Sequence, residues 1–243
     1  MSYFVKIKNH IVLVCDFFVD LLFPIACLEC GKEGEFVCLE CFNKLKPRHR
    51  QSCFGCKKEN NSGRFCVNCK SRYYLDGILI AGNYDDELLA KILKYYKYYF
   101  VKNISFDLGK FLILFFKDWQ NSNDFNVSEY SVMSIPLHRR RLGWRGYNQS
   151  ELLAIIFAGY FSLELLTNSL IRVKYKTAQA KLGELERREN IKDCFKFQGE
   201  NLKGLKVILI DDITTTSATL NEAAKVLKEN GAKEVLGLVV AKG

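Results

Sequence analysis

The chain has 243 residues, of which 36 are Lys or Arg and 27 are Asp or Glu, so its net charge at neutral pH is +9. Hydrophobic residues make up 49% of the chain, which is enough for a large core and excludes a wholly disordered protein. No stretch is long and apolar enough to span a bilayer, and the positive charge favours an anionic partner: a phosphate compound, a nucleic acid or a membrane surface.

Residues 1–24 are expected to form an amphipathic leading helix. Phe17, Phe18, Leu21 and Leu22 recur at helical spacing, and aspartates interrupt the apolar run, which a signal peptide would keep unbroken. We expect this helix to pack on its own protein and the protein to be cytoplasmic. Membrane association is the less favoured alternative.

Residues 25–72 are dominated by four Cys-x-x-Cys pairs. Each pair can offer two thiolates to one metal ion from a tight turn, and two pairs complete a tetrahedral zinc site. No export signal accompanies the cysteines, so the sequence predicts two structural zinc ions in a double zinc-ribbon module, not disulfides. Sequential pairing requires the shortest loops, but an interleaved arrangement stays open. The predicted ligands are Cys27, Cys30, Cys38, Cys41, Cys53, Cys56, Cys66 and Cys69.

Residues 73–243 alternate strand and helix patterns. This alternation predicts an α/β domain with a mainly parallel sheet, helices on both faces and ligands at the carboxyl ends of the strands. One helix is expected to begin with a capping pair of Asn148 and Glu151. The expected strands cover 77–81, 132–135, 170–173, 207–210 and 235–241, and the expected helices cover 86–95, 104–119 and 148–161, with another around 220–227.

Residues 94–99 interleave aromatic and basic side chains. Aromatic rings can stack on bases while ammonium groups contact phosphates, which suggests single-stranded nucleic acid. The alternative is a helix whose aromatic residues belong to the core. The candidate nucleic-acid-binding residues are Lys94, Tyr95, Tyr96, Lys97, Tyr98 and Tyr99.

Residues 137–149 follow the predicted strand 132–135 and therefore belong to the ligand-binding edge of the sheet. Arg139, Arg140, Arg141 and Arg145 are suited to bind pyrophosphate through forked hydrogen bonds. The alternative is a solvated basic loop.

Residues 207–219 combine a buried strand, two adjacent acids and a turn rich in hydroxyl side chains. The helix that follows offers free N–H groups to a phosphate, and vicinal carboxylates can accept hydrogen bonds from the 2′ and 3′ hydroxyls of a ribose 5-phosphate. The alternative is a helix cap preceded by solvated acids. The predicted ligand-binding residues are Asp211, Asp212, Thr214, Thr215, Thr216, Ser217, Ala218 and Thr219.

This segment resembles the 5-phosphoribosyl-1-pyrophosphate (PRPP) motif of type I phosphoribosyltransferases. The resemblance implies that Asp211 and Asp212 are the catalytic acids that hold the ribose hydroxyls, and that PRPP binds together with Mg²⁺. These enzymes usually have glycine where this chain has Ser217, and serine is strained if the turn requires a positive φ. In the same enzymes a stretch like 172–188 is the mobile loop that closes over PRPP; here its alternative is an exposed charged helix.

The order of motifs is similar to that of the ComF family, whose members carry an amino-terminal double zinc ribbon and a phosphoribosyltransferase domain. The resemblance implies that the protein binds PRPP and handles single-stranded DNA during natural transformation (competence), with other DNA-uptake proteins as possible further partners. The alternative is an active PRPP-dependent phosphoribosyltransferase with an unidentified acceptor. The resemblance rests on the cysteine pairs, residues 135–149, residues 211–219, and the set Gln179, Leu182, Arg187, Asn190 and Phe195.

Overall fold

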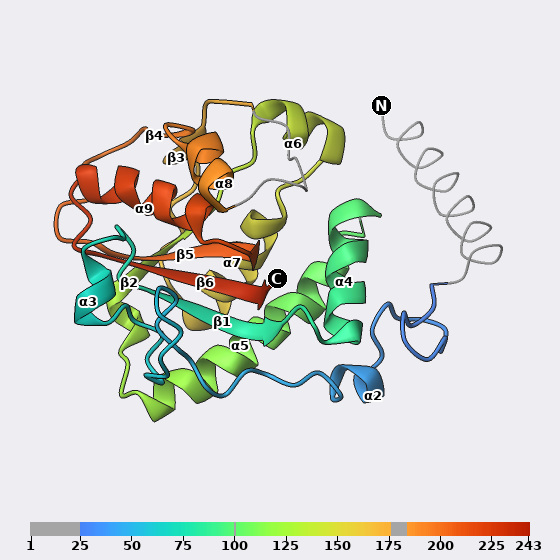
Figure 1. Cartoon of the computed structure of the whole chain (residues 1–243). Coiled ribbons are helices and arrows are strands. Elements are labelled where there is room, and N and C mark those ends of the chain that lie inside the picture. Colours follow the sequence, from blue (N-terminus) through green and yellow to red (C-terminus); the bar gives the residue numbers. More distant parts are fainter. Residues whose placement is uncertain (1–24, 100, 176–183) are drawn as a thin grey trace. The chain divides into compact units, whose positions relative to one another are not determined.

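The structure is a computed structural model that describes residues 25–99, 101–175 and 184–243 (Figure 1). Contacts divide the chain into two compact units, Met1–Leu45 and Lys46–Gly243. In the smaller unit a short helix, α2 (Leu39–Phe42), follows a bridge between Ala26 and Glu33. The expected helix over residues 1–24 lies outside the described residues.

The larger unit is built on a parallel sheet whose strands are buried on both faces. Its strand order is β1-β6-β5-β2, and all three pairings are parallel. Apolar runs such as 207–210 form these strands because side chains on both faces leave water. The strands are β1 (Gly77–Asn83), β2 (Tyr130–Ser134), β5 (Lys206–Thr214) and β6 (Glu234–Lys242).

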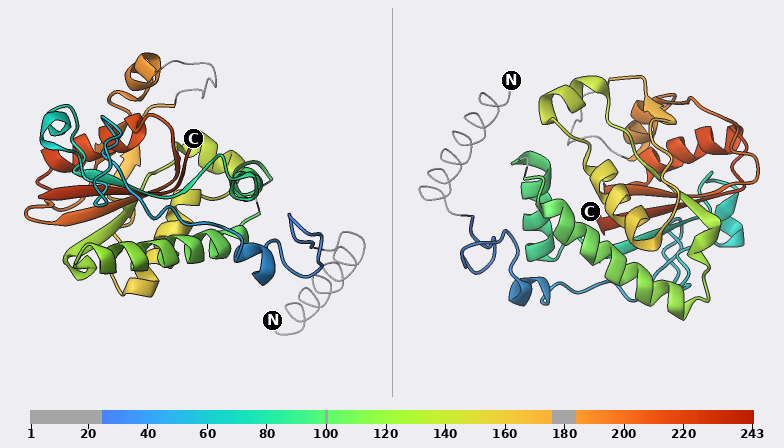
Figure 2. Two further views of the ribbon diagram at one scale, coloured as in Figure 1. Left: turned by 60° about the horizontal axis from the view of Figure 1, so that its bottom comes forward. Right: turned by 180° about the vertical axis from the view of Figure 1, so that it is seen from behind.

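Helices cover both faces of this sheet (Figures 1 and 2). Helix α9 (Ala218–Glu229) lies on one face, and α5 (Ile104–Ser122) and α7 (Gln149–Phe161) lie on the other. Helix α4 (Glu87–Tyr98) begins at Asp86, whose carboxylate accepts a hydrogen bond from the backbone N–H of Leu89 at 3.0 Å. The expected fold class, a mainly parallel α/β sheet with helices on both faces, is confirmed.

The core under α9 includes part of the cysteine-rich region. Cys53 and Cys69 are buried there together with Phe65, Leu209 and Leu227. The second half of the cysteine-rich region, including the short helix α3 (Val67–Lys70), therefore packs within the larger unit.

A second, two-stranded sheet corrects one expectation. The strand expected over 170–173 forms as β3 (Leu170–Arg172), but it pairs antiparallel with β4 (Phe195–Phe197), outside the parallel sheet. The edge of β2 that faces away from β5 pairs instead with the segment around Leu165, where Val132 N donates to Glu164 O at 2.7 Å. Helix α8 (Glu184–Ile191) lies between β3 and β4 in the chain.

The segment after β2 also differs from expectation. The basic run forms a short helix, α6 (Arg139–Arg145), which begins at His138 and ends at Gly146 with φ 78°. The expected capping by Asn148 is wrong: its side-chain amide donates to Ile135 O at 3.0 Å and makes no cap hydrogen bond. A single-turn helix, η1 (Val127–Glu129), precedes β2.

Candidate functional site

The candidate phosphate turn connects β5 to α9 at the carboxyl edge of the sheet. Strand β5 continues through both acids to Thr214, and α9 begins at Ala218, so only residues 215–217 form the turn. Within it, Ser217 N donates to the Thr214 hydroxyl at 3.2 Å. The first N–H groups of a helix lack an intrahelical acceptor, so this turn can receive an anion.

Asp211 and Asp212 occupy the end of β5 and are held by short hydrogen bonds. Asp211 Oδ1 accepts from Ser150 Oγ at 2.7 Å and from Asp212 N at 2.9 Å. Asp212 Oδ1 accepts from Ile213 N at 2.7 Å and lies 3.0 Å from Lys97 Nζ. Sequence reasoning had not placed Ser150 or Lys97 in this site.

The two acids and Lys97 are electrostatically linked. Burial, and then the charge of Asp212, raise the pKa of Asp211 to about 7. Burial alone would lower the pKa of Lys97, but the charges of Asp212 and Asp211 outweigh it and raise that pKa. The negative charge of the two carboxylates is therefore partly compensated by one half-buried cation.

Ser217 adopts the strained conformation that the family resemblance implied. Its φ is 59° and its ψ is 0°, in the left-handed region where glycine is favoured. Its hydroxyl oxygen is buried and has no hydrogen-bond partner among the described residues. The turn therefore has a backbone conformation that favours glycine. It also contains a buried hydroxyl group whose lost hydration is not replaced by a hydrogen bond among the described residues.

We expect Ser217→Gly to stabilise the protein. Removing the left-handed strain and the unpaired hydroxyl should outweigh the backbone entropy of glycine and add about 1 kcal/mol to the free energy of unfolding. The melting temperature, measured by circular dichroism, should rise by about 2–4 °C.

Ser162→Gly is the matched control, because Ser162 is a serine with φ 54° at the end of α7 and does not belong to the buried set. It should gain less, since no buried hydroxyl is removed there. A lower melting temperature for Ser217→Gly than for the wild type would show that its hydroxyl has a partner.

The four arginines predicted to bind pyrophosphate all lie on α6. Arg139 and Arg140 are exposed, whereas Arg141 and Arg145 are half-buried. Arg145 donates to Gln149 Oε1 at 2.9 Å, while its Nε is buried without a partner in the described part of the chain. Four guanidinium groups on one short helix are well suited to an anion.

A cavity of about 500 Å³ lies between α6, the start of α7 and β3. Its lining includes His138, Arg139, Asn148 and Arg172. Burial, followed by the charge of Arg140 and then of Arg172, lowers the pKa of His138. Sequence reasoning placed Arg172 at the start of the expected mobile loop, 172–188, and did not assign it to a cavity beside the arginines, although a charged residue within an apolar strand pattern was an available signal.

Several buried polar atoms around this edge lack a partner in the described residues. They are Asn148 Oδ1, Gln149 Nε2, Arg145 Nε, Arg172 Nε and Ser217 Oγ. Buried polar groups are normally satisfied, so atoms of this kind point to a polar ligand or ordered water at the site.

The aromatic end of α4 is not one continuous surface. Tyr96 is 0% exposed, and its hydroxyl donates to Gln149 O at 2.8 Å. Lys97 turns toward Asp212, as described above. Tyr96 and Lys97 are therefore removed from the candidate nucleic-acid surface, because one lies in the core and the other is paired.

The remaining candidates on α4 face outward. Tyr98 and Tyr99 are 60% and 57% exposed, and Tyr99 stacks on Tyr95 with ring centroids 4.4 Å apart. Lys94 is also exposed. These four residues, Lys94, Tyr95, Tyr98 and Tyr99, are called the α4 surface below.

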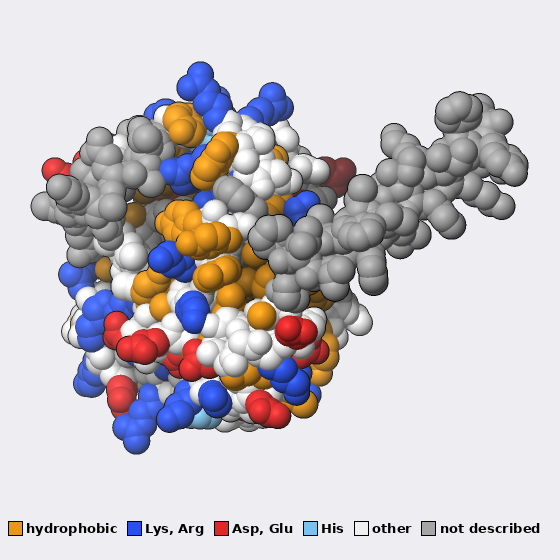
Figure 3. Space-filling model, turned by 90° about the vertical axis from the view of Figure 1, so that its right-hand side faces the viewer, with side chains coloured by type: hydrophobic (Ala, Val, Ile, Leu, Met, Phe, Trp, Pro, Cys, Tyr) orange, Lys and Arg blue, Asp and Glu red, His pale blue; other side chains and the backbone are white. Residues whose placement is uncertain are grey.

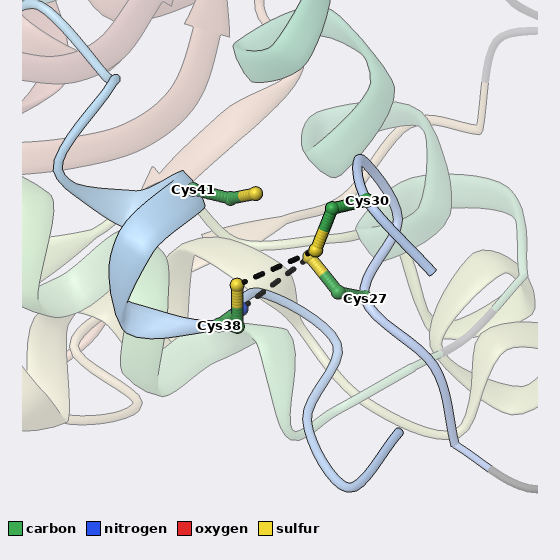
Figure 4. Close-up of side chains that lie close together, drawn as sticks. All are labelled: Cys27, Cys30, Cys38 and Cys41. Atoms are coloured by element: carbon green, nitrogen blue, oxygen red, sulfur yellow. Dashed lines mark hydrogen bonds between the residues drawn. The ribbon is translucent and has the colours of Figure 1, made fainter. Parts of the chain in front are cut away.

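The first cysteine cluster contains Cys27, Cys30, Cys38 and Cys41, whose sulfurs converge from two loops and α2 (Figure 4). Cys30 Sγ and Cys38 Sγ are 3.6 Å apart, and Cys38 N donates to Cys27 Sγ at 3.5 Å. Tetrahedral zinc with Zn–S bonds of about 2.3 Å separates its sulfurs by about 3.8 Å. The donor set therefore fits zinc.

The second cluster contains Cys53, Cys56, Cys66 and Cys69. Cys66 Sγ lies 3.8 Å from both Cys53 Sγ and Cys56 Sγ. Within each cluster all four sulfurs lie within 4.8 Å of one another, so the pairing is sequential, not interleaved. The chain has two four-cysteine sites for structural zinc.

The cysteines of each cluster differ in acidity. Burial alone would raise the pKa of Cys27 and of Cys53, but backbone N–H donors lower each to about 6. Burial raises the pKa of Cys69 to about 11. Zinc binding at such a site releases the protons that the more basic thiols hold.

Part of the stretch expected to close over PRPP falls outside the described part of the chain. Lys176, Gln179, Lys181 and Leu182 lie outside the described residues, as does the side chain of Arg187. Phe195 is buried in β4, where Arg172 lies 5.7 Å from its ring.

Comparison with known proteins gives a consistent result. The family described as "Double zinc ribbon domain" matches residues 18–73. Competence protein F of Haemophilus influenzae is 29% identical over 217 residues, which cover 82% of this chain and 94% of that protein. Competence protein ComFC of Bacillus subtilis is 28% identical over 239 residues, covering 93% of this chain and 91% of that protein. These matches support the ComF family as the family that this chain resembles.

A third relative is the DNA utilization protein YhgH of Salmonella typhi. It is 34% identical over 104 residues, which cover 43% of this chain and 45% of that protein. The names of these relatives support a role of this chain in competence. No helix in the described residues is both long enough and apolar enough to cross a membrane.

Proposed function

We propose that this chain, as a ComF-family protein, binds PRPP at the β5–α9 turn and handles incoming single-stranded DNA during natural transformation. The observation that carries the proposal is the juxtaposition of two acids at the end of β5 with a left-handed turn at the start of α9. Acids suit ribose hydroxyls and the turn suits a phosphate, so together they fit a phosphorylated ribose.

Each part of PRPP would meet a different group of residues. Asp211 and Asp212 would accept the ribose hydroxyls, and residues 214–219 would surround the 5-phosphate. The arginines of α6 would bind the pyrophosphate, and Mg²⁺ that binds together with PRPP would neutralise part of its charge. The unpartnered Arg145 Nε and Asn148 Oδ1 supply polar atoms for such a ligand.

Calorimetry with PRPP and Mg²⁺ tests this assignment directly. Saturable binding of PRPP, with weaker binding of ribose 5-phosphate and of pyrophosphate alone, is the result that the site requires, since each fragment satisfies only part of it. Equal affinity for pyrophosphate and PRPP would mean that the arginines bind anions without help from the acids, and would contradict the proposal.

Single-stranded DNA is proposed to contact the α4 surface. Two exposed tyrosines and the stacked Tyr95 offer flat rings to bases, and Lys94 lies beside them. The face seen in Figure 3 also shows hydrophobic side chains next to Lys and Arg side chains. This mixture is typical of proteins that bind single strands without reading their sequence.

We expect Tyr98→Ala/Tyr99→Ala to weaken the binding of a fluorescent oligothymidylate by at least about tenfold, because each lost base stack costs about 1–3 kcal/mol. Fluorescence anisotropy measures the affinity. Over a salt series, wild-type affinity should fall with a log–log slope of about −0.7 for each phosphate that a lysine or arginine contacts.

Tyr74→Ala is the control, because Tyr74 is 46% exposed and lies outside the α4 surface. It should bind as the wild type does. Equal weakening by both variants, or affinity that does not change with salt, would contradict this interface.

A second candidate function is catalytic transfer to an acceptor. The cavity beside α6 favours this second function, because Asn148 and Arg172 line the cavity and Arg172 interacts electrostatically with Asp211. An acceptor bound there would lie next to the ribose. Pyrophosphate release from PRPP in the presence of candidate acceptors, above the level without them, would establish turnover.

The same proposal includes the division of the chain into segments, its cellular location and its protein partners. It comprises a leading helix over 1–24, a double zinc-ribbon module over 25–72, a phosphoribosyltransferase-like domain over 73–243, a cytoplasmic location and contact with other DNA-uptake proteins. The family match over residues 18–73 supports the second of these segments.

A further inference from the structure

Lys97 is the residue of α4 that enters the candidate ribose site. Its Nζ lies 3.0 Å from Asp212 Oδ1, and the two side chains are only 22% and 8% exposed. Leu89 and Leu93, which precede it by two turns and one turn of the helix, are buried, so Lys97 continues the inward-facing stripe of the helix. A charge in that position requires a partner, and Asp212 is the partner.

The contacts of both acids leave their second oxygens available. Within the described residues, the hydrogen bonds and the ion pair that hold Asp211 and Asp212 all end on Oδ1. Each Oδ2 therefore remains able to accept a hydrogen bond from a hydroxyl group. An ionised carboxylate accepts a stronger hydrogen bond from a hydroxyl than a protonated one does, and two adjacent, largely buried carboxylates resist ionisation together.

We propose that Lys97 is a positioning residue of the ribose site: it fixes Oδ1 of Asp212, and its charge offsets the negative charge of the two acids, so that Oδ2 can bind a sugar hydroxyl. The ribose ligand in this inference rests on the proposed function. The contact between Lys97 and Asp212 does not.

Among the described charged and titratable groups around Asp211 and Asp212, Lys97 is the cation that forms an ion pair with them. From α4, Tyr96 and Lys97 face Asp212; Tyr147, just before α7, faces it from another element. Burial raises the pKa of both tyrosines, so they stay neutral near pH 7. Arg172 interacts with Asp211 from β3 and forms no ion pair with it among the described residues.

The test compares Lys97→Met with Lys97→Arg and with Lys91→Met. Lys91 is an exposed lysine on the same helix, so its variant controls for the loss of one positive charge. Carboxyl ¹³C NMR without ligand follows the titration of Asp211 and Asp212. Calorimetry with PRPP and Mg²⁺ between about pH 6 and pH 9, a range that brackets the pKa of about 7 of Asp211, follows affinity.

Lys97→Met should raise the titration midpoints of the acid pair by about one pH unit or more, because an adjacent opposite charge lowers a carboxyl pKa by about 1–3 units. PRPP affinity should fall by about tenfold or more near neutral pH and recover as the pH rises, since the carboxylate then ionises without help from Lys97. Lys97→Arg should restore both properties, and Lys91→Met should change neither.

The outcomes separate the two proposals. Unchanged carboxyl titration in Lys97→Met overturns the role of Lys97, whether or not PRPP binds. A loss of affinity that is the same at every pH also overturns it, since a purely structural role predicts that result. Shifted titration in a protein whose wild type does not bind PRPP supports the action of Lys97 on Asp212 and rejects the proposed ligand.

Discussion

Replacing Asp211 and Asp212 together by asparagine is expected to weaken PRPP binding by at least about 100-fold. Each carboxylate would lose a charge-assisted hydrogen bond to a ribose hydroxyl, worth about 1.5–3 kcal/mol, and each 1.4 kcal/mol is about a factor of ten in affinity. Calorimetry in the presence of Mg²⁺ provides the measurement. The direction of the change in affinity is informative, because removing two negative charges would by itself strengthen the binding of an anionic ligand.

Folding of this variant can be checked by its pH dependence. Because burial raises the pKa of Asp211 from 3.8 to about 7, the folded protein holds that proton more tightly than the unfolded chain. The free energy of unfolding therefore falls as pH rises between these two values. The asparagine variant lacks this loss, but it leaves Lys97 without a carboxylate partner. Circular dichroism at about pH 8 should therefore show a folded variant before its affinity for PRPP is compared with that of the wild type.

The chain contains a second adjacent pair of aspartates that serves as the control. Asp85 is exposed and Asp86 caps α4, and asparagine is also a good helix cap. Asp85→Asn/Asp86→Asn should therefore retain both PRPP binding and stability. If the two double variants bind PRPP equally well, Asp211 and Asp212 do not hold the ribose.

Loss of the second zinc site is expected to destabilise the larger unit strongly. Cys53 and Cys69 are 0% and 1% exposed within the core under α9. Breaking a structural metal site costs several kcal/mol, and each kcal/mol corresponds to about 2–4 °C in a domain of this size. Cys66→Ser should therefore lower the main melting temperature by about 10 °C or more, measured by calorimetry.

Cys38→Ser is the matched variant in the first site, because Cys38 and Cys66 each donate a backbone N–H to the first cysteine of their own cluster. Cys38 belongs to the smaller unit, so its loss should leave the main transition of the larger unit nearly unchanged. Metal analysis should find two zinc ions in the wild type and one in each variant. Two zinc ions in Cys66→Ser, with an unchanged melting curve, would rule out the assigned ligands.

Local patterns predicted much of this fold correctly. The runs around 77–81 and 207–210 are strands because an unbroken apolar stretch can be buried on both faces only in a covered parallel sheet. The cysteine pairs formed two clusters because each Cys-x-x-Cys turn already brings its own sulfurs close together. These features depend on neighbouring residues, so the sequence was sufficient.

Errors arose where a helix or strand had two available partners. The strand at 170–173 carries the expected apolar pattern, but such a pattern does not say which edge it will join, and β2 was already paired with the segment around Leu165. Lys97 was assigned to a surface because it stands among tyrosines. Its spacing from Leu89 and Leu93 was the signal that it faces inward.

The sequence by itself determined the parallel sheet, the two cysteine clusters and the acid-and-hydroxyl motif at the end of β5, because each of these is encoded by residues close together in the chain. Only the tertiary structure decided that Lys97 pairs with Asp212, that Arg172 lines the cavity beside α6, and that the second cluster joins the core under α9. These contacts join residues far apart in the chain, and which of them form is fixed by how helices and strands pack, which no local spacing records.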